Sequence, residues 1–121
     1  MQEFEVIFYE KDDGTMPAKE FLFSLENKKL KAKILKTISM LQTNGNSLRE
    51  PYSKYLEDGI FELRAKVGSD ISRVLYFFFV GNKIILTNGF IKKCQKTPKE
   101  ELEKAKQYRK EYFYREDDVN E

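Results

Sequence analysis

The spacing of hydrophobic and polar positions predicts one strand followed by two helices in the N-terminal part of the chain. Residues 4–9 are mostly apolar, which is typical of a strand with both faces buried. Apolar residues then recur at helical spacing from Pro17 to Leu25 and again from about Lys28 to Thr43. The second helix should end at Gly45, because glycine readily adopts the left-handed conformation found after helix ends.

Three stretches rich in strand-forming residues follow, at 60–67, 71–80 and 83–93. Turn sequences separate them, Gly68-Ser69-Asp70 and then Gly81-Asn82, which predicts two antiparallel hairpins. The preceding segment, residues 47–59, has no clear periodicity, and we expect it to be irregular. The three strands therefore form the centre of the predicted sheet.

A last helix is signalled by Thr97 as N-cap, Pro98 at the first helical position and Glu100 as the capping-box partner. We expect an α+β domain with a four-stranded, mainly antiparallel sheet, two N-terminal helices after the first strand, and a C-terminal helix. The helices should cover one face of the sheet and leave the other partly open. The inner stripe of the last helix is expected to contain Leu102, Ala105, Tyr108 and Tyr112.

The length of 121 residues predicts a single domain, which we assign to residues 1–115. Residues 116–121 form an acidic tail that we expect to be frayed. The tail holds four acidic residues and no basic one, so the net charge of +2 for the whole chain becomes +6 for residues 1–115. A basic excess of this size is consistent with a polyanionic partner.

Composition excludes several kinds of chemistry. Histidine is absent and Cys94 is the only cysteine, so the usual ligands of a zinc site are missing, and we expect neither a metal nor a cofactor. No apolar run approaches the roughly 20 residues that span a bilayer. The N-terminus lacks the features of a signal peptide, and a lone cysteine fits a reducing compartment, so we expect a cytoplasmic protein without membrane contact.

Two arginines in neighbouring predicted strands are the most informative polar residues. An arginine within an apolar strand is costly unless its charge has a partner or a ligand. Alternation puts Arg64 on the polar face of its strand, whereas Arg73 shares its face with apolar residues, so the pattern alone does not place the two side by side. Surface pairing, of Arg64 with Glu62 or Glu57 and of Arg73 with Asp70, is an equally open interpretation.

Further cations gather where the last strand leads into the last helix, at Lys92, Lys93, Lys96 and Lys99. Arginine offers a fork for a phosphate, lysine offers a point charge, and an aromatic side chain such as Phe90 offers a surface for a base. RNA is cleaved without a metal when its 2′-hydroxyl attacks the adjacent phosphate, and cations that stabilise the growing charge accelerate this step. A phosphate-binding groove for RNA is therefore the leading hypothesis from the residues.

The order of four motifs resembles the RelE/ParE toxin superfamily, and most closely its HigB branch, which includes phage-derived homologues. The motifs are Gly59-Ile60-Phe61-Glu62-Leu63-Arg64, Arg73-Val74-Leu75-Tyr76-Phe77, Gly89-Phe90-Ile91-Lys92-Lys93, and Lys96-Thr97-Pro98 leading into residues 101–112. The likeness covers nearly the whole chain, and it implies a RelE-like fold.

The resemblance implies the toxin of a type II toxin–antitoxin system, acting as a metal-independent endoribonuclease that cleaves mRNA on the ribosome. It further implies a helix-turn-helix antitoxin of the HigA type, with operator DNA bound only through that antitoxin. By position, it implies catalytic roles in phosphate binding and proton transfer for Arg64, Arg73, Lys92 and Lys93. It also suggests that the substrate is bound by Lys54, Tyr76, Phe90 and Lys96.

Relatives with a histidine near the site differ from this chain, which leaves the acid and base unassigned between tyrosines such as Tyr76 and Tyr112 and the lysines. Two other functions stay open from the sequence. One is a ParE-like toxin that blocks DNA gyrase without cleaving RNA, and the other is a binding module without toxicity.

Overall fold

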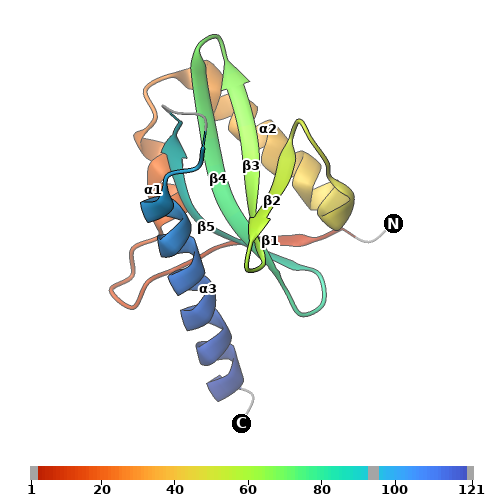
Figure 1. The fold of residues 1–121 in the computed structure, drawn as a ribbon, viewed down its shortest axis with the longest axis vertical. Coiled ribbons are helices and arrows are strands. Elements are labelled where there is room, and N and C mark those ends of the chain that lie inside the picture. Colours follow the sequence, from red (N-terminus) through yellow and green to blue (C-terminus); the bar gives the residue numbers. More distant parts are fainter. Residues whose placement is uncertain (1–2, 93–95, 120–121) are drawn as a thin grey trace.

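The computed structural model describes residues 3–92 and 96–119 of the chain. It is an α+β fold in which one strand and two helices precede four strands and a last helix (Figure 1). The elements are β1 (Glu5–Phe8), α1 (Pro17–Ser24), α2 (Lys28–Asn44), the short 3₁₀ turn η1 (Gly45–Ser47), β2 (Ser53–Glu57), β3 (Ile60–Val67), β4 (Asp70–Phe79), β5 (Lys83–Ile91) and α3 (Lys99–Val119). Within the described residues, no helix is both long and apolar enough to cross a membrane.

The strands form one sheet in the order β1-β5-β4-β3-β2, in which only β1 and β5 run parallel. The α+β class and the order of the predicted elements are confirmed, but the expectation of four strands is wrong. The fifth strand, β2, lies in the segment for which the sequence predicts irregular structure. It pairs with β3 and forms the edge of the sheet opposite β1.

The β2–β3 turn explains how so short and polar a strand is held in place. Asp58 and Gly59 both have positive φ angles, of 50° and 80°. An Asp-Gly pair with this conformation is typical of a two-residue hairpin turn, because its twist matches that of the flanking strands. The turn sets Glu57 opposite Ile60, and a shift in register between Tyr55 and Glu57 then places Tyr55 opposite Phe61 and Lys54 opposite Glu62.

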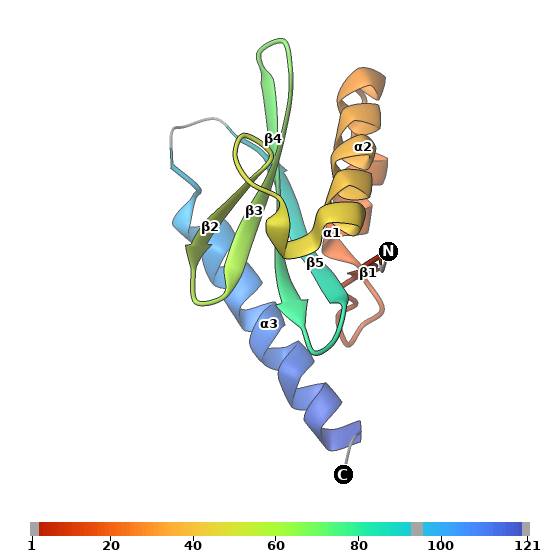
Figure 2. The ribbon, with the colours of Figure 1, turned by 90° about the vertical axis from the view of Figure 1, so that its right-hand side faces the viewer.

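The sheet is covered on both faces. Figure 2 shows α1 and α2 on one side of it and α3 on the other. The expectation that the helices cover only one face is therefore wrong, and the reason lies in β4. Its residues Val74 and Tyr76 pack beneath α1 and α2, while the alternate residues Leu75 and Phe77 pack beneath α3. A strand that is apolar on both faces needs cover on both.

The two helices on the first face of the sheet, α1 and α2, begin at residues typical of helix starts, and α2 ends at the glycine that the sequence predicts. Pro17 stands at the start of α1. The Asn27 side chain caps α2 by accepting a hydrogen bond from the Leu30 N–H at 3.0 Å. Gly45, with φ +53°, ends α2 and is buried against the ring of Phe4. This layer holds the larger of the two buried clusters.

On the other face, α3 begins at Lys99, one residue after the predicted first helical position. Its predicted inner stripe is confirmed, since Leu102, Ala105, Tyr108 and Tyr112 belong to the buried cluster between α3 and the sheet. The helix continues to Val119, so it includes the start of the acidic segment. The domain boundary after residue 115 stays a prediction.

Replacing Gly45 with alanine should destabilise the fold by about 2–4 kcal/mol, since the new Cβ overlaps the Phe4 ring and the φ angle is left-handed. Urea unfolding followed by circular dichroism measures this loss.

Gly68→Ala is the matched control. Gly68 also has a positive φ, of +61°, but nothing lies within 4 Å of the position that a Cβ would take there. The free energy of unfolding of Gly68→Ala should fall by only about 1 kcal/mol, because backbone strain is its only cost. Equal losses in the two variants would show that the contact between Gly45 and Phe4 does not contribute.

Candidate functional site

The sheet register places the two arginines directly opposite each other. Arg64 of β3 pairs with Arg73 of β4, and Arg73 pairs in turn with Phe90 of β5. Residues that face each other across neighbouring strands project from the same face of a sheet. The three side chains therefore form one row on the face that carries α3, an arrangement that strand alternation alone does not predict.

Glu62 holds this row together. Its side chain is only 1% exposed, and its Oε1 atom lies 3.1 Å from Nε of Arg64 and 3.1 Å from Nε of Arg73. The Thr97 hydroxyl, from the segment before α3, donates a hydrogen bond to the other carboxylate oxygen. One buried carboxylate thus links β3, β4 and the start of α3.

The two arginines differ in their surroundings. Arg73 is buried, and its Nη1 donates to the Ser72 carbonyl at 3.1 Å. Burial lowers the pKa of the Arg73 guanidinium, while the Glu62 charge acts in the opposite direction. The guanidinium stays charged, since arginine is not deprotonated in proteins. Removing Glu62 would therefore leave Arg73 as a buried cation that keeps its hydrogen bond to the Ser72 carbonyl but has no opposite charge beside it among the described residues.

Arg64 is 23% exposed and reaches solvent. Its Nη1 lies 3.3 Å from the carboxylate of Glu50, which is 66% exposed, so this second ion pair is weak. Of the two surface partners considered for Arg64, Glu62 does pair with it, but this carboxylate is buried and not at the surface. The pairing of Arg73 with Asp70 is wrong, because Asp70 accepts a hydrogen bond from Asn27 and Glu62 takes its place.

A cleft of about 280 Å³ opens beside Arg64, between β2, β3, the end of β5 and the start of α3. It brings together four of the residues that the sequence suggested, Lys54, Arg64, Lys92 and Lys96. The remaining lining residues are Tyr55, Leu56, Glu57, Glu62, Thr97 and Leu102. Four cations and two carboxylates face this space, and Glu62 is already engaged by arginines, so the cleft favours an anion.

Other suggested residues lie elsewhere. Tyr76 is 1% exposed beneath α1 and α2, on the opposite face from Arg64, and its hydroxyl forms a 2.5 Å hydrogen bond with Ser53. Burial raises the pKa of Tyr76 to about 12, as expected of a core side chain, and Tyr76 does not line the cleft. Phe90 packs in the cluster beneath α3. Lys93 lies outside the described residues.

Sequence reasoning missed the role of Glu62, although it considered the residue as a surface partner. The available signal was its position two residues before Arg64, which puts both side chains on one face of β3. The sequence pattern assigns the Thr97 hydroxyl to helix capping, whereas it donates to Glu62. Within residues 3–92 and 96–119, no group of three or more acidic, histidine or cysteine side chains is arranged to hold a metal ion.

One protein-family profile matches this sequence. The sequence profile described as phage derived protein Gp49-like (DUF891) matches residues 20–110, well over half of the chain, and the match includes the whole cleft. The chain belongs to the Gp49-like family. This is a toxin-like family related to the RelE and HigB toxins of type II systems. No curated protein matches the chain.

In this Gp49-like protein, Glu62→Gln should lower the free energy of unfolding by about 3–5 kcal/mol. The amide keeps the shape of the carboxylate, but it leaves Arg73 buried without an opposite charge. Chemical denaturation at neutral pH provides the measurement.

Glu50→Gln removes a carboxylate from the same arginine at an exposed position and serves as the control. It should change stability by less than about 1 kcal/mol. If the two substitutions lower the free energy of unfolding by the same amount, the buried carboxylate does not organise the site.

Proposed function

We propose that this Gp49-like protein is the HigB-like toxin of a type II toxin–antitoxin system and cleaves mRNA at the cationic cleft. The observation that carries the proposal is the fixed position of Arg64 beside Lys54, Lys92 and Lys96, in a cleft whose buried anchor is Glu62. Glu62 holds this guanidinium through Nε, and among the described residues its outer nitrogen Nη1 meets only the exposed Glu50, a weak ion pair that a phosphate can replace. This arrangement suits a phosphodiester.

The proposed reaction is transesterification within the RNA. The 2′-oxygen attacks the adjacent phosphorus, and the bond from phosphorus to the 5′-oxygen of the next nucleotide breaks. The products are a 2′,3′-cyclic phosphate and a 5′-hydroxyl. Negative charge builds on the non-bridging oxygens, where Arg64 and the lysines stabilise it.

The proton leaving the 2′-hydroxyl and the proton reaching the 5′-oxygen require titratable groups at the cleft. Neither Tyr76 nor Tyr112 lines it, since the first lies on the opposite face and the second packs against Phe77 and Phe79. Among the described residues, we assign proton transfer to the titratable lining groups Lys54, Tyr55, Glu57, Lys92 and Lys96. Arg73 acts as a positioning residue, through Glu62.

The cellular setting follows from the family relationship. We propose that the protein acts in the cytoplasm on ribosome-bound mRNA, and that a helix-turn-helix antitoxin of the HigA type neutralises it. Operator DNA would be contacted through that antitoxin only. The family's relation to RelE and HigB toxins supports this assignment.

Arg64→Gln should reduce mRNA cleavage by roughly 100-fold or more, because it removes the charge nearest the reacting phosphate. Primer extension on cellular mRNA after a short pulse of expression detects the cuts. Lys36→Gln, at an exposed position on α2 away from the cleft, should cleave like the parent protein.

Growth inhibition with intact mRNA would reject the nuclease function, and accompanying DNA damage signalling would favour a gyrase-blocking toxin. Undiminished cleavage by a folded Arg64→Gln protein would instead reject the assignment of the site. Absence of any effect on growth would indicate a binding module.

A further inference from the structure

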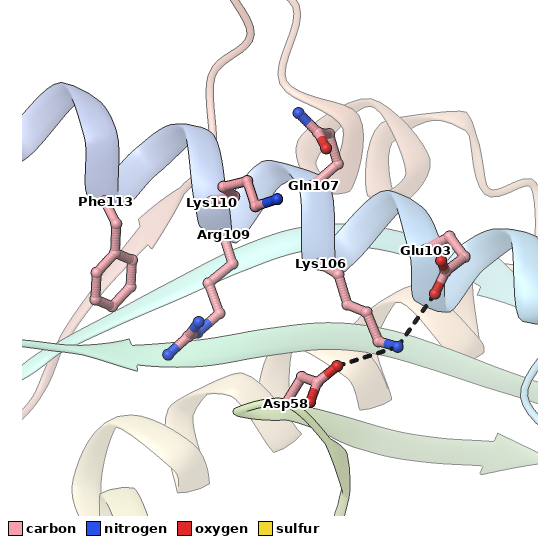
Figure 3. Close-up of a pocket in the computed structure, with 7 residues that line it drawn as sticks. All are labelled: Asp58, Glu103, Lys106, Gln107, Arg109, Lys110 and Phe113. Atoms are coloured by element: carbon pink, nitrogen blue, oxygen red, sulfur yellow. Dashed lines mark ion pairs between the residues drawn. The ribbon is translucent and has the colours of Figure 1, made fainter.

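A second cavity, of about 550 Å³, lies between α3 and the β2–β3 turn (Figure 3). It is separate from the cationic cleft, and its walls carry both signs of charge. The carboxylates are Asp58 and Glu103, and the cations are Lys106, Arg109 and Lys110.

Lys106 forms ion pairs with both carboxylates of this cavity. Its Nζ lies 3.2 Å from Asp58 Oδ2 and 3.1 Å from Glu103 Oε2, as the dashed lines in Figure 3 mark, and it also binds Glu57. These contacts tie α3 to the β2–β3 turn. They leave the acidic groups of the cavity already paired.

Arg109 has no such partner. Among the described residues no carboxylate forms an ion pair with it, and its Nε is buried without a hydrogen bond. The guanidinium carbon lies 4.5 Å from the centre of the Phe113 ring and 6.0 Å from that of Phe77. In Figure 3, Arg109 and Phe113 project from α3 in the same direction, towards the sheet. A half-buried cation without an anion is unfavourable in the isolated chain.

Gly59 completes the slot that holds this guanidinium. A Cβ at Gly59 would lie 2.9 Å from Nε and 3.1 Å from Cζ of Arg109, so a larger residue at this position would displace the guanidinium from the slot. Gly59 also has a φ of +80°, which the hairpin turn requires. The guanidinium is thus held between a backbone turn and an aromatic ring, and its orientation is fixed before any ligand arrives.

We infer that this Arg109 slot binds a carboxylate side chain of a partner polypeptide. A planar guanidinium matches a carboxylate through two parallel hydrogen bonds. An arginine stacked on an aromatic ring in a cavity is also typical of the residues that dominate protein–protein binding. An apolar residue next to the acidic one in the partner would pack on Phe113.

The walls favour a peptide over a nucleic acid. Lys106 is engaged by Glu57, Asp58 and Glu103, so the cavity offers Arg109 and its neighbour Lys110 but no row of cations for the successive phosphates of a nucleic acid chain. A peptide presents a single carboxylate, which one guanidinium matches. None of the residues that hold Arg109 belongs to the cationic cleft, so the slot is independent of the proposed cleavage chemistry.

The test is selection of binding peptides from a phage-displayed library of random dodecapeptides against the full-length protein. Selected peptides are then titrated calorimetrically into the parent protein, Arg109→Gln and Arg115→Gln. Arg115 lies on the same helix and also stacks on an aromatic ring, but Asp12 already pairs with it. Enriched peptides should carry Asp or Glu beside an apolar residue, and Arg109→Gln should weaken their binding by about tenfold or more, with Arg115→Gln unchanged.

A measurement on the parent protein covers the case in which Arg109→Gln does not fold. The Nε–H resonance of Arg109 in ¹⁵N NMR spectra should shift when a selected peptide is added. Failure to enrich acidic peptides, an unchanged Arg109 resonance, or equal affinity for folded Arg109→Gln would overturn the inference. A tenfold loss for the oligonucleotide rU12 in that variant, without a loss for peptides, would identify a nucleic acid site instead.

Discussion

The ion pairs of Glu62 with two arginines are the interaction on which the candidate site depends. A carboxylate buried to this extent is unfavourable unless opposite charges and hydrogen bonds compensate it. Arg64, Arg73 and Thr97 together provide that compensation. The same contacts fix the orientation of Arg64 and join the segment before α3 to the sheet. Stability and the geometry of the cleft therefore have one common origin.

The helix α3 lies on the face that carries both arginines, of which Arg73, on the central strand β4, is buried and Arg64, one strand nearer the edge, is partly exposed. Apolar residues on both faces of β4 require a helix on each side, and α3 crosses the face on which both arginines stand. Its start borders the cationic cleft through Leu102, and its middle borders the second cavity through Arg109. Lys106 lies between these regions and ties the helix to the β2–β3 turn. One helix thus separates a cleft that favours an anion from a cavity of mixed charge.

Local signals in the sequence were enough to predict both N-terminal helices, the hairpins of β3 to β5 and the inner stripe of α3. They missed β2 because its residues 53–57 are few and mostly polar, although Asp58-Gly59 was a recognisable hairpin turn. The clustering of cations suggested Arg64, Lys92 and Lys96, and the resemblance to a toxin superfamily added Lys54; the cleft brings these four residues together. The placement of Arg73 beside Arg64 depends on strand register, a long-range property that alternation within one strand does not specify. The sequence did not reveal that Tyr76 is buried away from the cleft, because its burial depends on which face α1 and α2 cover.

The central claim is that the cationic cleft promotes attack of a 2′-oxygen on the neighbouring phosphate of RNA. The most direct measurement is the chemistry of the RNA ends formed after a pulse of expression, by sequencing fragments that carry a 2′,3′-cyclic phosphate. The account predicts new fragments with this end, paired with 5′-hydroxyl ends at the next nucleotide. New cuts that carry 3′-hydroxyl ends, or no new ends during growth inhibition, would contradict it.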